Sequence, residues 1–251
     1  MHLLRTKFKN EIVSEFLPAK VTSNKVIIFC SGMPGYPDKT KSIELCEYFS
    51  KKGYWCFVPR YRGAWESEGE LFLKSPHQDI LDVMDELPKG FRDLWNGNKF
   101  VIKNPEIYIF GSSFGGPAGL LCSKDTRVKK VVCFSPVIDW REEKNTVEPI
   151  SKLSKYVDEA FGNAYRVAKN GWKKIEKGEI YNPATEFEKI DGKKILIFHA
   201  KNDEVVSQKP LKSFVDKTSS GLILLKTGGH LGMSVMKPKF LKICLKFLKE
   251  K

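Results

Sequence analysis

The sequence predicts an α/β fold in which a mostly parallel sheet of about eight strands carries helices on both faces. Short apolar runs alternate along the chain with segments of helical periodicity, as in strand–helix crossovers. These runs are continuously apolar, which is typical of strands buried on both faces. The alternation stops between residues 140 and 183, where only helical spacing is found. We therefore expect a single domain over 1–251 with a small helical cap inserted at 140–183.

Length and composition support one soluble domain. The chain has 251 residues, of which 41% are hydrophobic, enough for one large core. Residues 1–10 carry charges and no apolar stretch follows them, so no signal peptide is expected. The longest apolar runs are too short for a membrane span. Six cysteines occur singly without a CxxC pair, which indicates free thiols in a reducing compartment, the cytoplasm.

The net charge of +13 has two interpretations. It can reflect attraction to nucleic acid, membrane phosphates or an acidic substrate. It can also reflect a lysine-rich solvated surface. Lysines are scattered through every segment and no nucleic-acid-binding module accompanies them, so the second interpretation is favoured and no specific nucleic-acid partner is expected.

The first half of the chain predicts strands and helices in turn. A weak strand or hairpin is expected between Phe8 and Pro18, and glycine- and proline-rich loops separate the elements that follow. Asp38 or Thr40 can cap the first helix, and Ser75-Pro76 starts the second. The strands expected here are Lys25 to Cys30, Tyr54 to Val58, a run that begins after Asn104-Pro105, and Val128 to Phe134.

The second half begins with the helical segment 140–183. Apolar residues recur there at helical spacing from Ile150 to Ala164. A long crossover helix would also fit, but insertions at loop ends often cover sites, so a lid is favoured. Strand–helix alternation then resumes. The expected elements are a strand at 194–198, a helix at 210–217, a strand at 222–225 and a final helix from about Ser234 to Glu250.

The segment 107–116 combines an apolar strand with Gly-x-Ser-x-Gly and a helix start. A strand that reverses into a helix this quickly needs glycines, because a Cβ would collide with the neighbouring element. Ser113 stands at the centre of the turn, with a helix from Phe114 to about Ser123 behind it. An inert glycine-rich turn would show the same pattern, so the motif alone does not establish a nucleophile.

A serine nucleophile needs a base, and the base needs a carboxylate that orients it. Among the four histidines, His230 lies between glycines just after the last predicted strand, so its loop can curl back over the sheet edge. His2 lies near the terminus, His77 starts a helix, and His199 ends a strand and shapes the loop that follows. His230 is therefore the expected base, although a solvent-facing loop histidine would be the default for this residue alone.

The expected acid is Asp203, in the turn after the preceding strand. Aspartate in such a turn often serves only to form it, and Glu204 is the rival carboxylate. Ser113, Asp203 and His230 each follow a predicted strand, and in a parallel sheet these positions converge on one edge. The three together indicate a nucleophile, an acid and a base.

These motifs resemble the α/β-hydrolase superfamily, and most closely its dienelactone-hydrolase and prolyl-oligopeptidase-like branch. The resemblance covers nearly the whole chain and rests on residues 111–116, 203–206 and 228–230, with 62–63 and 66–69 resembling a loop of the same branch. It implies the α/β-hydrolase fold and an oxyanion hole made by the backbone N–H groups of Met33 and Phe114. Relatives commonly have His-Gly at Ser31-Gly32 and an acidic residue at Arg60, which weakens any transfer of substrate preference.

The function that follows is that of a serine hydrolase acting on a carboxylic ester or thioester of a small molecule. No metal or organic cofactor is expected, and a homodimer is one possible assembly. The resemblance leaves a small serine peptidase, an acylaminoacyl-type amidase and an acyltransferase as alternatives, although the chain has no room for the propeller of prolyl-oligopeptidase relatives. A non-catalytic basic binding protein is the alternative of another class. The residues expected to contact the substrate are Tyr36, Tyr156, Phe161 and Trp172.

Overall fold

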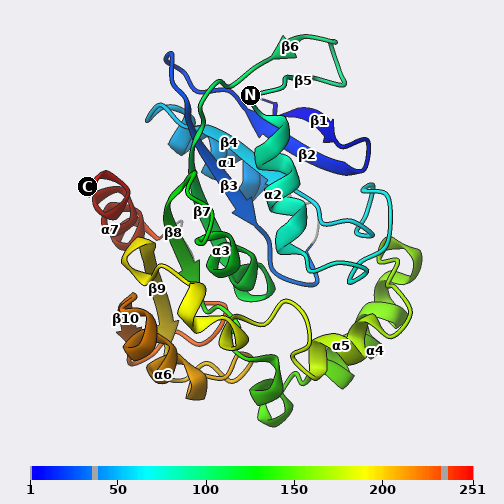
Figure 1. Cartoon of the computed structure of the whole chain (residues 1–251), viewed down its shortest axis with the longest axis vertical. Helices are drawn as coiled ribbons and strands as arrows, with labels where there is room; N and C mark the ends of the chain where they lie inside the picture. The colour runs from blue at the N-terminus through cyan, green and yellow to red at the C-terminus, as the bar shows by residue number, and fades with distance from the viewer. Residues whose placement is uncertain (1, 36–38, 233–236, 251) are drawn as a thin grey trace.

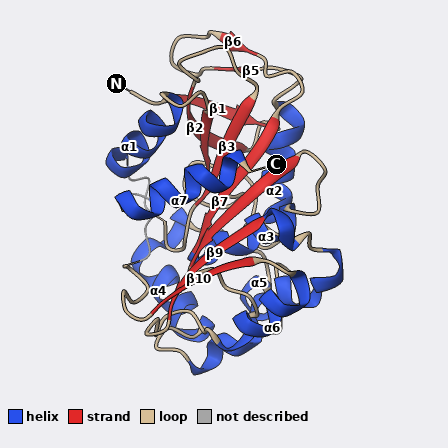
Figure 2. Cartoon of the chain, turned by 90° about the vertical axis from the view of Figure 1, so that its left-hand side faces the viewer, coloured by secondary structure: helices blue, strands red, loops and turns tan. Residues whose placement is uncertain are grey.

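One eight-stranded sheet runs through the molecule, with helices on both of its faces (Figure 1, Figure 2). The structure is a computed structural model that describes residues 2–35, 39–232 and 237–250. The strand order is β1-β2-β4-β3-β7-β8-β9-β10. The β1–β2 and β2–β4 pairs are antiparallel and the remaining pairs are parallel, which confirms the predicted mostly parallel sheet. The strands are β1 (Leu4–Phe8), β2 (Ile12–Leu17), β3 (Lys25–Cys30), β4 (Trp55–Pro59), β7 (Glu106–Ser112), β8 (Val128–Phe134), β9 (Ile195–Ala200) and β10 (Gly221–Leu225).

The apolar strands bury both of their faces, and each face has its own core. Along β3, Val26 and Ile28 contribute to one core, whereas Ile27 and Phe29 contribute to the other. The first core packs under α2 (His77–Glu86), α3 (Gly116–Cys122) and α6 (Lys209–Thr218). The second packs under α1 (Lys39–Ser50) and α7 (Pro238–Lys249). Because side chains alternate across a strand, only a continuous apolar run can fill both cores.

The predicted elements differ from the structure mainly at their ends. The expected hairpin begins earlier, at β1, because Leu4 and Thr6 belong to an edge strand that alternates in character. A small second sheet formed by β5 (Phe91–Arg92) and β6 (Lys99–Phe100) was not predicted, because two-residue strands leave no periodic signal. Among the described residues, no helix is long and apolar enough to cross a bilayer.

The segment 140–183 is helical and packs against the loop that follows β4. It contains η2 (Trp140–Asn145), α4 (Ile150–Phe161), η3 (Gly162–Ala164) and α5 (Gly171–Glu176), and its final η4 (Pro183–Thr185) extends just past it. Its extended contacts are isolated bridges between Ala64 and Tyr165 and between Leu71 and Val167. Backbone bonds reinforce this contact, with the Arg166 N–H donating to the Gly63 carbonyl at 2.7 Å. The segment is thereby tied to residues 63–71.

Candidate active site

Ser113 occupies a sharp turn between β7 and α3. Its φ of +52° lies in the left-handed region, which is uncommon for a residue with a side chain and is found mostly where the surroundings impose it. A three-residue turn, η1 (Ser113–Gly115), leads directly into α3. A Cβ added at Gly115 would lie 2.1 Å from the Cys30 carbonyl oxygen, so only glycine fits against β3. The strained geometry presents Ser113 at the carboxyl end of a central strand.

Asp203 uses its two carboxylate oxygens for different tasks. Oδ1 accepts hydrogen bonds of 3.0 Å from the N–H groups of Val205 and Val206, which forms the turn after β9. Oδ2 lies 2.9 Å from Nδ1 of His230. The Asp203 side chain is fully buried and that of His230 is 16% exposed. Asp203 therefore both forms the turn after β9 and pairs with His230.

The environment of Asp203 keeps its carboxylate ionised. Burial alone would raise its pKa, but the hydrogen bond with His230 and the N–H of Val206 outweigh burial and lower the pKa to about 2. An ionised acceptor at Nδ1 fixes the proton of a neutral imidazole on that nitrogen. Nε2 of His230 is then the ring nitrogen able to accept a proton.

The loop that carries His230 is tied to the Asp203 turn. The Gly229 N–H donates a 3.0 Å hydrogen bond to Oδ1 of Asn202. The φ of Gly229 is +57°, a value that glycine adopts without steric cost. The glycines flanking the histidine therefore give the loop the curvature that the sequence predicts.

A small cavity, of about 20 Å³, opens beside Ser113. Val205 and Val206, which follow Asp203 in the turn, form part of its wall. Because β7, β8 and β9 are adjacent and parallel, their carboxyl ends bring the Ser113 and Asp203 loops to the same edge. Five wall residues come from the segment 140–183: Trp140, Glu143, Glu148, Ile150 and Leu153.

Met33 and Phe114, the expected oxyanion-hole residues, both line this cavity. A Cβ added at Gly32 would lie 3.3 Å from Cβ of Ser113, so the 31–35 loop passes directly alongside the serine. Phe114 lies in the first turn of η1, where N–H groups have no partner within the helix. The structure thus places the two backbone segments of the predicted oxyanion hole next to Ser113.

Two aromatic side chains hold the 31–35 loop at Gly35. The Trp65 Nε1–H donates to the Gly35 carbonyl at 2.6 Å. The Gly35 N–H donates to the Tyr165 hydroxyl at 2.9 Å, and the Tyr165 oxygen lies 3.2 Å from the Gly35 carbonyl. Tyr165 belongs to the segment 140–183, so that segment contacts the loop as well as the cavity.

Tyr181 supports the turn that carries Ser113, and the sequence did not predict this role. Its buried hydroxyl donates to the Phe114 carbonyl at 2.7 Å and accepts from the Ala118 N–H at 3.1 Å. The Trp140 Nε1–H donates to the Tyr181 carbonyl at 2.7 Å. A lone tyrosine before Asn182-Pro183 has no distinguishing sequence pattern, so only the three-dimensional contact reveals this support.

Two other histidines, His199 and His77, lie outside the loop that carries His230. His199 is fully buried on β9, with Nε2 3.8 Å from Oδ2 of Asp203, and neither ring nitrogen has a hydrogen-bond partner among the described residues. Burial lowers the pKa of His199, because the charged form of the ring is poorly hydrated there. His77 begins α2 and contacts Ser75 at 2.7 Å. The Glu204 side chain is exposed, in contrast to Asp203.

The aromatic residues expected to contact the substrate are not among the described residues that line the cavity. Phe161 packs edge-on against Trp65, and Tyr156 is 46% exposed with its ring against Phe161. Trp172 packs against Phe72, with ring centroids 5.0 Å apart. Tyr36 lies outside the described residues. The cavity next to Ser113 is instead bordered by Trp140, Glu143 and aliphatic side chains.

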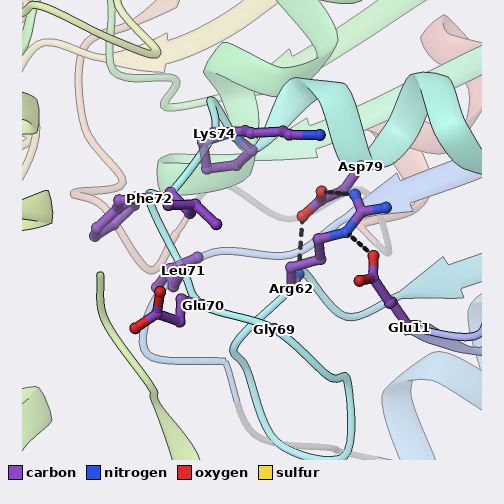
Figure 3. Close-up of a pocket in the computed structure, with 10 residues that line it drawn as sticks. Glu11, Arg62, Gly69, Glu70, Leu71, Phe72, Lys74 and Asp79 are labelled. Carbon is purple, nitrogen blue, oxygen red and sulfur yellow. Dashed lines mark hydrogen bonds and ion pairs between the residues drawn. The ribbon is translucent and has the colours of Figure 1, made fainter. Parts of the chain in front are cut away.

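A second cavity, of about 110 Å³, lies beside the loop that follows β4 (Figure 3). Arg62 borders it, and its guanidinium contacts the carboxylates of Glu11, Asp79 and Asp82. The Arg62 N–H also donates to Oδ2 of Asp79 at 2.8 Å. The cation is therefore already neutralised, and its role is to anchor this loop to the turn before β2 and to α2. No group of three or more candidate metal ligands is present in the part of the chain that the structure describes.

No family model and no curated protein matches the sequence, but solved structures share the fold. An esterase from Pyrococcus furiosus is 15% identical, with a TM-score of 0.70 over 98% of this chain and 90% of that one. An α/β hydrolase from Penicillium sp. sh18 is 14% identical, with a TM-score of 0.65 over 98% and 97%. An acylaminoacyl peptidase from Pyrococcus horikoshii is 16% identical, with a TM-score of 0.66 over 100% of this chain and 41% of that one. The chain has the α/β-hydrolase fold.

Proposed function

We propose that the protein is a serine hydrolase that cleaves a carboxylic ester or thioester of a small molecule. The observation that carries this proposal is the 2.9 Å contact between His230 Nδ1 and Asp203 Oδ2, on the sheet edge that also presents Ser113 in a strained turn. A serine hydroxyl becomes a nucleophile when an imidazole removes its proton and a carboxylate orients that imidazole, and the Asp203–His230 pair supplies the last two of these groups. The esterase and hydrolase structures with the same fold support the same class.

In the proposed mechanism, Ser113 Oγ attacks the acyl carbonyl while His230 Nε2 accepts its proton. Asp203 holds the Nδ1 proton and stabilises the imidazolium that forms. The N–H groups of Met33 and Phe114 donate to the negatively charged carbonyl oxygen. His230 then protonates the leaving alcohol or thiol, and water activated by the same imidazole releases the acid from Ser113.

The segment 140–183 acts in this proposal as a cap over the acyl group. It supplies Trp140, Ile150 and Leu153 to the cavity wall, and its Tyr165 holds Gly35 of the oxyanion loop. A cap that contacts both parts couples closure over the substrate to the position of the Met33 N–H. Excluding water from such a site strengthens the hydrogen bonds to the developing charge.

A panel of p-nitrophenyl esters of increasing acyl length, together with matched peptide p-nitroanilides, tests the proposal. The cavity of about 20 Å³ leads us to expect the highest kcat/KM for acetyl to butanoyl esters. The value is expected to fall by roughly tenfold or more at octanoyl, because the added methylenes extend beyond a small pocket. The esters are expected to be cleaved well above the matched anilides.

Two results would change the assignment. Preferential cleavage of the anilides would favour the peptidase alternative. The acylaminoacyl peptidase with the same fold supports that alternative. Hydrolysis of neither class by folded protein would contradict the hydrolase proposal and favour a non-catalytic binding protein. Circular dichroism on the same preparation checks that the protein is folded.

A further inference from the structure

Glu143 is a buried carboxylate in the wall of the cavity beside Ser113. It lies on η2, is only 3% exposed, and borders the same space as Ser113 and Phe114. Its carboxylate accepts from the Ser207 N–H, with Oε2 at 3.0 Å and Oε1 at 3.3 Å. The proposed mechanism gives this group no task.

Glu143 lacks a positive partner in the described part of the chain. No lysine, arginine or histidine there forms an ion pair with it, whereas the nearby Asp139 pairs with Arg141 and Asp203 with His230. Buried carboxylates are usually paired, because an uncompensated charge is costly away from water. Among the described residues, Glu143 is therefore a buried carboxylate without a cationic partner, in the wall of the cavity beside Ser113.

The charged groups around Glu143 are acidic. Asp139 and Glu142 precede it in the chain, Asp203 lies in the turn after β9, and Glu148 borders the same cavity. Burial raises the pKa of Glu143 to about 7, and Asp203, Asp139 and Glu142 act in the same direction against the Ser207 N–H. A cation placed in this cavity would relieve the repulsion and supply the missing partner. The rest of the wall near Glu143 is largely apolar and offers none.

Given a hydrolase centred on Ser113, we propose that Glu143 is a specificity-determining residue that selects acyl groups bearing a positively charged amine. The ammonium group of a short amino-acyl ester would enter the cavity with its scissile carbonyl at Ser113. There it would form a charge-assisted hydrogen bond with the Glu143 carboxylate. The proposed substrate class is therefore a small amino-acyl ester or thioester rather than a simple fatty acyl ester.

The test compares two ethyl esters of the same shape, β-alanine ethyl ester and ethyl butanoate, at about pH 8, where the amine is protonated. The preference is the ratio of their kcat/KM values. Comparing this ratio between wild type and variants cancels the intrinsic difference in reactivity. In Glu143→Gln, the side-chain carbonyl still accepts from Ser207 but the charge is gone, so the ratio is expected to fall roughly tenfold to a hundredfold.

Glu142→Gln is the matched control, because Glu142 is the adjacent residue in η2 but does not line the cavity. Its ratio is expected to stay within about twofold of wild type, since its charge is nearer to solvent. An unchanged ratio in Glu143→Gln, or an equal fall in both variants, would overturn the proposal.

A wild-type measurement keeps the proposal testable if Glu143→Gln does not fold. Each wild-type kcat/KM is divided by the rate constant for hydroxide-catalysed hydrolysis of the same ester. A normalised preference for the β-alanyl ester of at least about tenfold is expected, and no preference would overturn the selectivity. If hydrolysis of both esters persists in Ser113→Ala, the proposed function fails instead. Loss of hydrolysis in that variant without a wild-type preference refutes the role of Glu143 alone.

Discussion

Replacing Ser113 with alanine is expected to lower kcat for ester hydrolysis by roughly 10⁴- to 10⁶-fold, because Ser113 forms the acyl intermediate in the proposed mechanism. The residual rate above water would come from the backbone N–H groups of Met33 and Phe114. The substitution removes the hydroxyl and adds no bulk to the turn. The measurement is burst and steady-state kinetics on the best p-nitrophenyl ester.

Ser112→Ala is the matched control for that experiment. Ser112 is the exposed neighbour at the end of β7, with an ordinary extended φ of −129°. Its substitution is expected to change kcat/KM by less than about threefold. If Ser112→Ala abolishes activity while Ser113→Ala retains it, the nucleophile has been assigned to the wrong serine.

Replacing Asp203 with asparagine is expected to lower kcat by roughly 10⁴-fold. The amide has no charge with which to stabilise the His230 imidazolium, and its NH₂ group can select the wrong imidazole tautomer. The asparagine carbonyl can still accept from Val205 and Val206, so the turn after β9 is retained. Kinetics together with the thermal unfolding midpoint separate loss of catalysis from loss of folding.

Glu204→Gln provides the comparison for Asp203. The exposed Glu204 is adjacent in sequence, and its substitution is expected to leave kcat within about threefold of wild type. A fall in activity of similar size in both variants would contradict the assignment of the acid to Asp203.

The Asp203 carboxylate also contributes to the free energy of unfolding in a defined pH range. Its pKa in the folded protein is about 2, against an ordinary value of 3.8. Because the folded-state value is the lower one, its contribution is complete above about pH 4 and is lost as the pH falls through about 2. Asparagine does not titrate, so Asp203→Asn removes this part of the acid dependence.

The mostly parallel sheet could be predicted from the sequence because its strands depend on local patterns, and the loops that carry Ser113 and Asp203 follow strands of that sheet. The β3 and β8 bounds, Lys25–Cys30 and Val128–Phe134, agree with the predicted strands, since the apolar runs at 26–30 and 131–134 mark buried strands. The parallel order then brings the loops after β7 and β9 to one edge. Local patterns and topology together sufficed to place these two loops.

The residues that line the cavity could not be predicted from the sequence in the same way. Glu143 lies in a run of charged residues that looks like a solvated surface, and only tertiary packing of η2 buries it. Tyr181 supports the serine turn across 67 positions of the chain, a contact without a periodic signal. The predicted aromatics Phe161 and Trp172 instead pack on Trp65 and Phe72. Aromatic side chains often pack against other rings, so aromatic character alone does not identify the residues that line a pocket.

The most direct measurement is covalent labelling with a fluorophosphonate, followed by mass spectrometry of the modified peptide. The proposed mechanism predicts one equivalent of label on Ser113, loss of ester hydrolysis in step with labelling, and no label in Ser113→Ala. Labelling should slow strongly in Asp203→Asn, because the same imidazole activates the serine toward the probe. Folded wild-type protein that remains unlabelled while a standard serine hydrolase reacts would contradict the central claim, as would label that persists in Ser113→Ala.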